Sequence, residues 1–203
     1  MRTAPKASRP SSWRSRAAGA ALLIAAAGSA RAEGEVRGRL VGERVFPAVV
    51  YVGDLPDETA SPQTRATMKQ LHLSFSPPVL PVLQGTTVDF INSDATAHNV
   101  FSPSPPAFDL GTFGEGTRSL LFRAPGTHVI LCNVHLEMVA WIVVLRNPHF
   151  SSVDEDGRFA LKLPAGRHRL VLWRPREPEL TMDVESRMEE GTSFEWVLSQ
   201  RRP

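Results

Sequence analysis

The chain has 203 residues, with 23 basic and 21 acidic side chains and a single cysteine. This balanced charge offers no strongly basic surface, so we expect no nucleic-acid partner. One cysteine cannot close an internal disulfide, which excludes a fold held together by disulfide bonds.

The first 32 residues have the layout of a secretory signal peptide. Basic residues come first, the apolar run "AAGAALLIAAAG" covers 17–28, and Ala30 and Ala32 form an Ala-x-Ala cleavage site. A transmembrane helix is the alternative, but the run is shorter than the roughly 20 apolar residues that a bilayer requires. We therefore expect removal of residues 1–32, no membrane span, and a periplasmic or secreted protein with a net charge of about −4.

Short segments of alternating or β-branched apolar residues then follow one another between turns rich in proline and glycine. This pattern predicts an all-β protein. In chain order, the expected strands are 35–41, 47–52, 70–75, 86–92, 98–101, 117–122, 127–131, 139–145, 157–163, 167–173 and 192–198. One segment, 178–190, has weak helical character.

Two polar, turn-rich stretches divide these strands into groups. The first, "DLPDETASPQTRAT", covers 54–67, and the second, "NPHFSSVDEDG", covers 147–157. They predict a central domain bounded by a linker and two flanking segments. The predicted bounds are 33–54 for the first flank, 55–65 for the linker, 66–146 for the central domain and 147–203 for the second flank.

The cysteine lies in the heptapeptide "CNVHLEM", with His135 three residues after Cys132 and Met138 three residues after that. On a helix this spacing would be compatible with a simple core stripe. The β-branched segments on both sides argue against a helix and predict a loop that joins two adjacent strands. In such a loop the three side chains can converge on one point.

A fourth ligand from a distant strand would fix this loop to the rest of the domain, and His98 in "INSDATAHNVFS" is the candidate. Two imidazoles, a thiolate and a weak thioether are the ligands of a trigonal blue-copper electron-transfer site. Structural zinc sites use cysteine and histidine without methionine, so Met138 favours one type 1 copper ion. The alternatives are an ordinary buried thiol for Cys132 and plain core packing for Met138.

At these residues the chain resembles the cupredoxin (type 1 blue copper) family, and its amicyanin-like and plastocyanin-like members in particular. The matching pieces are "FSPPVLPVLQG", "GTTVDFINSD", "AHNVF" and "PGTHVILCNVHLEM". The resemblance covers roughly residues 66–146 and implies a Greek-key β-sandwich or barrel that carries electrons between a donor and an acceptor redox protein. It implies that His98, Cys132, His135 and Met138 bind copper.

The same resemblance implies that the Asn99 side chain hydrogen-bonds to the loop carrying Cys132, although a solvated turn asparagine is the alternative. Two features depart from the family pattern. The loop lacks the usual prolines, and Glu137 directly precedes Met138. A Glu137 ligand would give a non-blue site in a minor copper enzyme, but carboxylate is a hard ligand and thioether a soft one.

The remaining sequence gives no second chemical centre. There is no His-x-His or Cys-His pair for a catalytic copper site, so we predict a carrier and not an enzyme. The alternative is a copper-binding or partner-recruiting module that does not redox-cycle. Val134 and Leu136 are expected to form a small apolar docking patch. The isolated histidines, expected to be surface or satisfied core residues, are His72, His128, His149 and His168.

The flanks resemble the two halves of a carboxypeptidase-regulatory or transthyretin-like sandwich. "GEVRGRLVGERVFPAVVYVGD" over 34–54 matches the first half, and "DEDGRFALKLPAGRHRLVLW" over 154–173 matches the second. This resemblance implies a second small β-sandwich that is discontinuous in sequence, with the copper domain inserted into it. In the alternative arrangement, residues 34–54 add strands to the central barrel.

Overall fold

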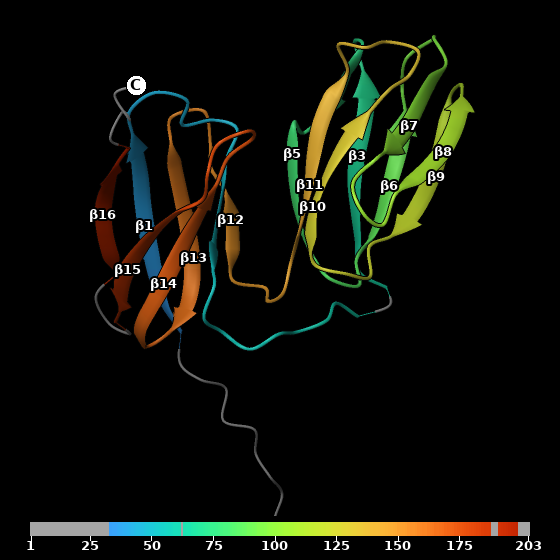
Figure 1. The fold of residues 1–203 in the computed structure, drawn as a ribbon. Helices are drawn as coiled ribbons and strands as arrows, with labels where there is room; N and C mark the ends of the chain where they lie inside the picture. Colours follow the sequence, from blue (N-terminus) through green and yellow to red (C-terminus); the bar gives the residue numbers. More distant parts are fainter. Residues whose placement is uncertain (1–32, 62, 188–190, 199–203) are drawn as a thin grey trace, which may run out of the picture. The chain divides into compact units, whose positions relative to one another are not determined.

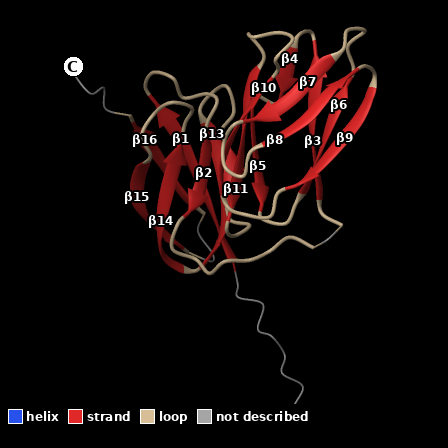
Figure 2. Cartoon of the chain, turned by 45° about the vertical axis from the view of Figure 1, so that its right-hand side comes forward, coloured by secondary structure: helices blue, strands red, loops and turns tan. Residues whose placement is uncertain are grey.

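The computed structural model describes residues 33–61, 63–187 and 191–198, so the predicted signal peptide lies outside the described residues. All regular secondary structure in this part of the chain is β-strand, and the strands form four sheets (Figures 1 and 2). The predicted all-β class is confirmed. Within the described ranges, no helix has the length and apolar character needed to span a membrane.

The strands near both ends of the described chain form one pair of sheets. A three-stranded sheet has the order β13-β1-β16, and a four-stranded sheet has the order β12-β2-β14-β15. The bounds are β1 Glu33–Val41, β2 Val49–Val52, β12 Phe150–Ser152, β13 Arg158–Pro164, β14 Gly166–Trp173, β15 Leu180–Ser186 and β16 Thr192–Val197.

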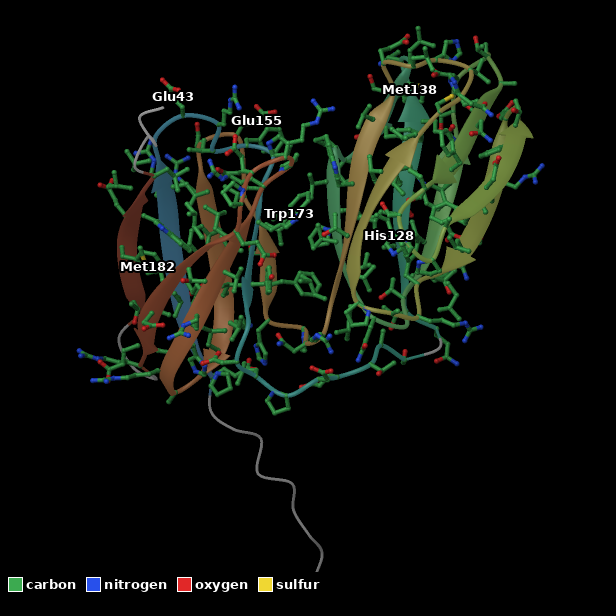
Figure 3. The ribbon with its side chains drawn as sticks, in the orientation of Figure 1. Glu43, His128, Met138, Glu155, Trp173 and Met182 are labelled. Atoms are coloured by element: carbon green, nitrogen blue, oxygen red, sulfur yellow. The ribbon has the colours of Figure 1, made fainter. Side chains whose placement is uncertain are left out.

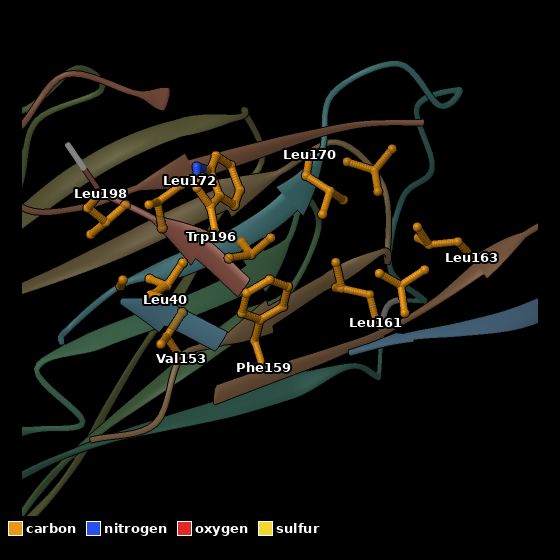
Figure 4. Packing of buried hydrophobic residues seen from close by; sticks show 13 residues of the cluster. Leu40, Val153, Phe159, Leu161, Leu163, Leu170, Leu172, Trp196 and Leu198 are labelled. Atoms are coloured by element: carbon orange, nitrogen blue, oxygen red, sulfur yellow. The ribbon is translucent and has the colours of Figure 1, made fainter. Parts of the chain in front are cut away.

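Alternation of buried and exposed residues explains this pair of sheets, because successive side chains of a strand point to opposite faces. In β1, Val36 and Leu40 are buried while Arg37 and Arg39 face solvent. The inward residues form one hydrophobic cluster, shown in Figure 4, to which β16 adds Trp196.

The expectation of a weak helix over 178–190 is wrong. Residues 180–186 form β15, which pairs antiparallel with β14 along seven positions. Leu180, Met182 and Val184 recur every second residue and pack against the same cluster, so the period of two decides for a strand. Residues 188–190 lie outside the described residues.

The intervening strands form the second pair of sheets. A five-stranded sheet has the order β5-β11-β10-β7-β8, and a four-stranded sheet has the order β4-β3-β6-β9. The bounds are β3 Arg65–Leu71, β4 Ser74–Ser76, β5 Val79–Leu83, β6 Thr87–Asn92, β7 His98–Ser102, β8 Phe108–Phe113, β9 Gly116–Leu121, β10 Gly126–Leu131 and β11 Val139–Leu145.

These sheets share one hydrophobic cluster, which we call the central core. Phe90, Ile130 and Ile142 are fully buried members, and Cys132 and Met138 belong to the same cluster. Among the described residues, β1 and β2 pair with strands that follow β11, and the strands from β3 to β11 pair with one another. The domain bounds and the transthyretin-like character of the flanks stay predictions.

His128, on β10, is a core histidine, as one of the two expectations had it, but one of its ring nitrogens is unpaired. It is only 3% exposed, and its Nδ1 atom has no hydrogen-bond partner. Its ring packs edge-on against Phe122, with 5.1 Å between ring centroids, and near Phe108. Burial lowers the pKa of His128, because the charged imidazolium loses its hydration.

This burial predicts a pH-dependent stability of the metal-free protein. A lowered pKa means that the unfolded chain binds the proton more readily, so stability should fall as the pH drops below about 6.5. Urea unfolding of the wild type and of His128→Phe at pH 7.5 and pH 5.5 measures the effect. The His128→Phe variant should lose less stability than the wild type, and the exposed-site control His72→Asn should lose as much as the wild type. Equal losses in all three proteins would contradict the prediction.

Candidate metal centre

The predicted loop joins two adjacent strands of the five-stranded sheet. Cys132 directly follows β10, Met138 directly precedes β11, and the two strands pair antiparallel over six positions. Within the loop, the Met138 N–H donates to the carbonyl oxygen of His135 at 3.1 Å, which closes a tight turn without any proline. Figure 3 places Met138 at the end of these strands.

His98, the predicted ligand from outside the loop, is the first residue of β7, which pairs with β10 in the same sheet. The possible ligand atoms of His98, Cys132 and His135 all lie within 4.8 Å of one another. His98 is fully buried, Cys132 is 2% exposed, and His135 is half-buried. Met138 is buried in the same cluster as Cys132. The structure therefore brings together residues that are 34 positions apart in the chain.

The two imidazoles meet through one particular pair of atoms. The Nδ1 atoms of His98 and His135 lie 3.0 Å apart, and their rings are arranged edge to face. At this separation two lone pairs would repel each other. The pair is stable either with a proton between the nitrogens or with both lone pairs directed at a cation. With a thiol sulfur beside them, the atoms are a nitrogen, nitrogen and sulfur set that suits copper or zinc.

Asp94 determines which nitrogen of His98 carries the proton. Its carboxylate Oδ2 lies 2.8 Å from Nε2 of His98. An ionised carboxylate only accepts hydrogen bonds, so Nε2 must be the protonated nitrogen of the neutral ring. This leaves the lone pair on Nδ1, the atom that faces His135. Carboxylate groups bonded to ligand histidines orient the ring and raise its basicity.

A tight turn holds the Asp94 carboxylate in place. The backbone N–H groups of His72 and Leu73 donate to its two oxygens at 2.7 and 3.0 Å. Both turn residues have left-handed backbone angles, with φ of 54° and 55°, a conformation that costs non-glycine residues roughly 1–2 kcal/mol each. The hydrogen bond from the Leu73 N–H is the main cause of the lowered pKa of Asp94, so this carboxylate stays ionised to a lower pH than an ordinary aspartate.

The expected role of Asn99 is wrong for its side chain. The side-chain Nδ2 of Asn99 donates to Asp109 at 2.7 Å, and its Oδ1 has no partner. The backbone N–H of Asn99 instead donates to the sulfur of Cys132 at 3.4 Å. The link between the two ligand segments therefore exists through the main chain, while the side chain joins β7 to β8 beside the register shift at Asn99.

Three residues beside the candidate ligands on the loop face outward. Glu137 is exposed whereas the neighbouring Met138 is 1% exposed, so the thioether and not the carboxylate enters the core. Leu136 is 83% exposed and Val134 is 47% exposed, as expected for an apolar patch around His135. Asp94 was missed in the sequence, although its position four residues before His98 was a usable signal.

Comparisons with known proteins match part of the chain. No protein-family profile matches the chain. The chain is 28% identical over 102 residues to amicyanin-alpha of Methylorubrum extorquens, a match that covers 48% of this chain and 86% of that protein.

Two solved structures illustrate the structural similarity. A reduced amicyanin variant is 26% identical, covering 47% of this chain and 98% of its own, with a TM-score of 0.39. A purple cupredoxin from Nitrosopumilus maritimus is 21% identical, covering 39% of this chain and 99% of its own, with a TM-score of 0.37.

Proposed function

We propose that this chain is an exported type 1 copper protein that carries single electrons between redox partners. One copper ion would be held by His98, Cys132, His135 and Met138. The observation that carries the proposal is the convergence of two imidazole nitrogens and a thiol sulfur within 4.8 Å, from β7 and from the loop after β10. The sequence similarity to amicyanin-alpha, which covers 48% of this chain, supports it.

Copper in such a site supplies a one-electron couple between Cu(I) and Cu(II). The protein's part is to keep the ligand atoms in one arrangement, so that little movement accompanies a change of charge. His98 is suited to this, since it sits fully buried in a strand and its ring is fixed by Asp94 at 2.8 Å. Cys132 is buried at the end of β10 and accepts the N–H of Asn99.

Electrons would enter and leave at the half-buried edge of His135, the most exposed of the three converging ligands. The side chains beside it, Val134 and Leu136, offer apolar area that a partner can cover without displacing charged groups. We propose a redox protein as donor and another as acceptor, in the periplasm or outside the cell. We further propose that the chain itself is a carrier and not an enzyme.

Purification of the exported protein, addition of Cu(II) and stepwise reduction with a small mediator test this function. The expected result is an intense visible thiolate-to-copper band that disappears and returns with one electron per protein. A band that does not respond reversibly would instead favour a copper-binding or partner-recruiting module. A weakly coloured, readily exchanged site would favour ligation by Glu137. No band at all would contradict the proposal.

A further inference from the structure

One further buried polar side chain, that of Gln70, has no hydrogen-bond partner. Gln70, on β3, has no exposed surface, and neither Oε1 nor Nε2 of its carboxamide makes a hydrogen bond. A buried amide left unpaired costs roughly 1–3 kcal/mol for each group. Among the described residues, Gln70 is the one whose side chain has both its donor and its acceptor buried and unpaired. Such a group requires an explanation beyond packing.

The position of Gln70 relates it to the metal centre. Its side chain points inward on the same face of β3 as Met68, which lies in the central core together with Cys132 and Met138. In the register, Gln70 pairs with Asn92 of β6, and the N–H of the following Ser93 donates to the Gln70 carbonyl oxygen at 2.9 Å. This is the level at which β6 ends and the chain turns toward Asp94 and His98.

The second neighbouring strand gives the same placement. Gln70 pairs antiparallel with Phe75 of β4, another buried residue of the central core. The hairpin between β3 and β4 is the turn whose N–H groups hold Asp94. The unpaired carboxamide of Gln70 therefore lies at the end of the central core that is near the metal centre.

The metal centre would be stabilised by an additional hydrogen-bond donor to the Cys132 sulfur. A cysteine that binds a metal does so as a thiolate, which places a negative charge in the apolar core. Within the described residues, the sulfur of Cys132 accepts one hydrogen bond, from the N–H of Asn99. Hydrogen bonds around the cysteine sulfur tune the reduction potential of blue-copper sites. An additional N–H donor would both stabilise the thiolate and satisfy Gln70.

We propose that Gln70 is a positioning residue of the metal centre, whose carboxamide N–H donates to the Cys132 thiolate when metal is bound. The proposal rests on the proposed function. In the metal-free protein the same carboxamide stays unpaired. Gln70 is thus expected to lower the stability of the metal-free protein and to raise the stability of the metal-bound protein. These two opposite effects can be measured.

The test compares Gln70→Leu with the wild type in both states. The metal-free variant should unfold at a higher urea concentration, since an apolar side chain of similar volume replaces an unpaired amide. Its Zn(II) affinity should fall about tenfold, as for other groups that support metal ligands. With copper, its charge-transfer band should move to longer wavelength and its reduction potential should fall, because the sulfur keeps more electron density.

Two further variants serve as a control and as a substitute for Gln70→Leu. Met68→Leu changes the neighbouring inward residue of β3 by a volume-conserving substitution and should leave the band and the potential unchanged. Gln70→Met removes the amide with an unbranched side chain, should Gln70→Leu fail to fold. The wild-type copper spectrum is recorded first. If the wild type shows no band, the proposed function fails, and this is known before any variant is compared.

Two results would overturn the inference. Stability changes of the same sign in the metal-free and Zn(II)-bound proteins, with unchanged band and potential, would assign the Gln70 carboxamide to a buried water. A reduction potential that rises in Gln70→Leu would indicate that the carboxamide oxygen is a metal ligand and that its N–H is not a donor to sulfur.

Discussion

Replacing Cys132 with serine is expected to abolish the visible charge-transfer band completely. The band requires a thiolate bonded to Cu(II), and Cys132 is the only cysteine of the chain. A serine hydroxyl does not ionise near neutral pH and is a hard oxygen donor, so it cannot supply the same transition. Copper titration of both proteins, followed by visible absorption, measures the effect.

The Cys132→Ser variant should remain folded. Serine has nearly the shape of cysteine, and the N–H of Asn99 can donate to its oxygen as it does to the sulfur. We expect a loss of about 1–2 kcal/mol in the free energy of unfolding of the metal-free protein, because a hydroxyl replaces a thiol in an apolar core. Met138→Leu serves as the matched control, since it removes the other sulfur of the loop but keeps the thiolate and should keep the band. A band that persists in Cys132→Ser would show that the colour comes from another site.

Replacing Asp94 with asparagine is expected to weaken Zn(II) binding about 10–100-fold. The carboxylate fixes the proton on Nε2 of His98 and leaves Nδ1 free. An asparagine keeps only one acceptor oxygen, whereas the carboxylate accepts the N–H of His72 with Oδ1 and both the N–H of Leu73 and Nε2–H of His98 with Oδ2. With the amide nitrogen in the Oδ2 position, the proton of His98 moves to Nδ1, the atom that faces His135 at 3.0 Å. With the amide oxygen there, the proton stays on Nε2, but the neutral amide is a weaker acceptor than the carboxylate and the ring becomes less basic.

Competition with a chelator measures the affinity of the Asp94→Asn variant, and nitrogen NMR of the imidazole ring reports which tautomer is present. Asp89→Asn is the matched control, since Asp89 on β6 pairs with Arg65 and does not touch the metal centre. Unchanged Zn(II) affinity with a shifted tautomer would show that His98 is not a ligand. Unchanged affinity with an unshifted tautomer would show that Asp94 does not control the ring.

The all-β class and the loop with its candidate ligands were predictable because their signals are local. Strand periodicity, turn residues and the spacing of Cys132, His135 and Met138 all lie within short windows of sequence. His98 could be predicted as a candidate because a loop with three ligands needs a fourth ligand on another strand to hold it in place. The helix expected over 178–190 failed because its polar residues masked an alternation that pairing with β14 makes decisive.

The supporting contacts around the ligands were not predictable from the same signals. Asp94 depends on a turn at His72 and Leu73, and a left-handed turn without glycine or asparagine leaves no mark in the sequence. Asn99 was correctly expected to link its strand to Cys132, but the bond comes from its backbone N–H and not from its side chain. The unpaired amide of Gln70 and the buried ring of His128 depend on which strand face each residue occupies.

The pairing of β1 has a consequence for the order in which the chain acquires its shape. Its partners β13 and β16 come more than 100 residues later, as in the pair of Val36 and Leu161. The strands from β3 to β11 find their partners within a much shorter stretch. Closure of distant segments is slow. The sheets that bear the candidate ligands are therefore expected to assemble early, with β1 unpaired until β13 has been synthesised.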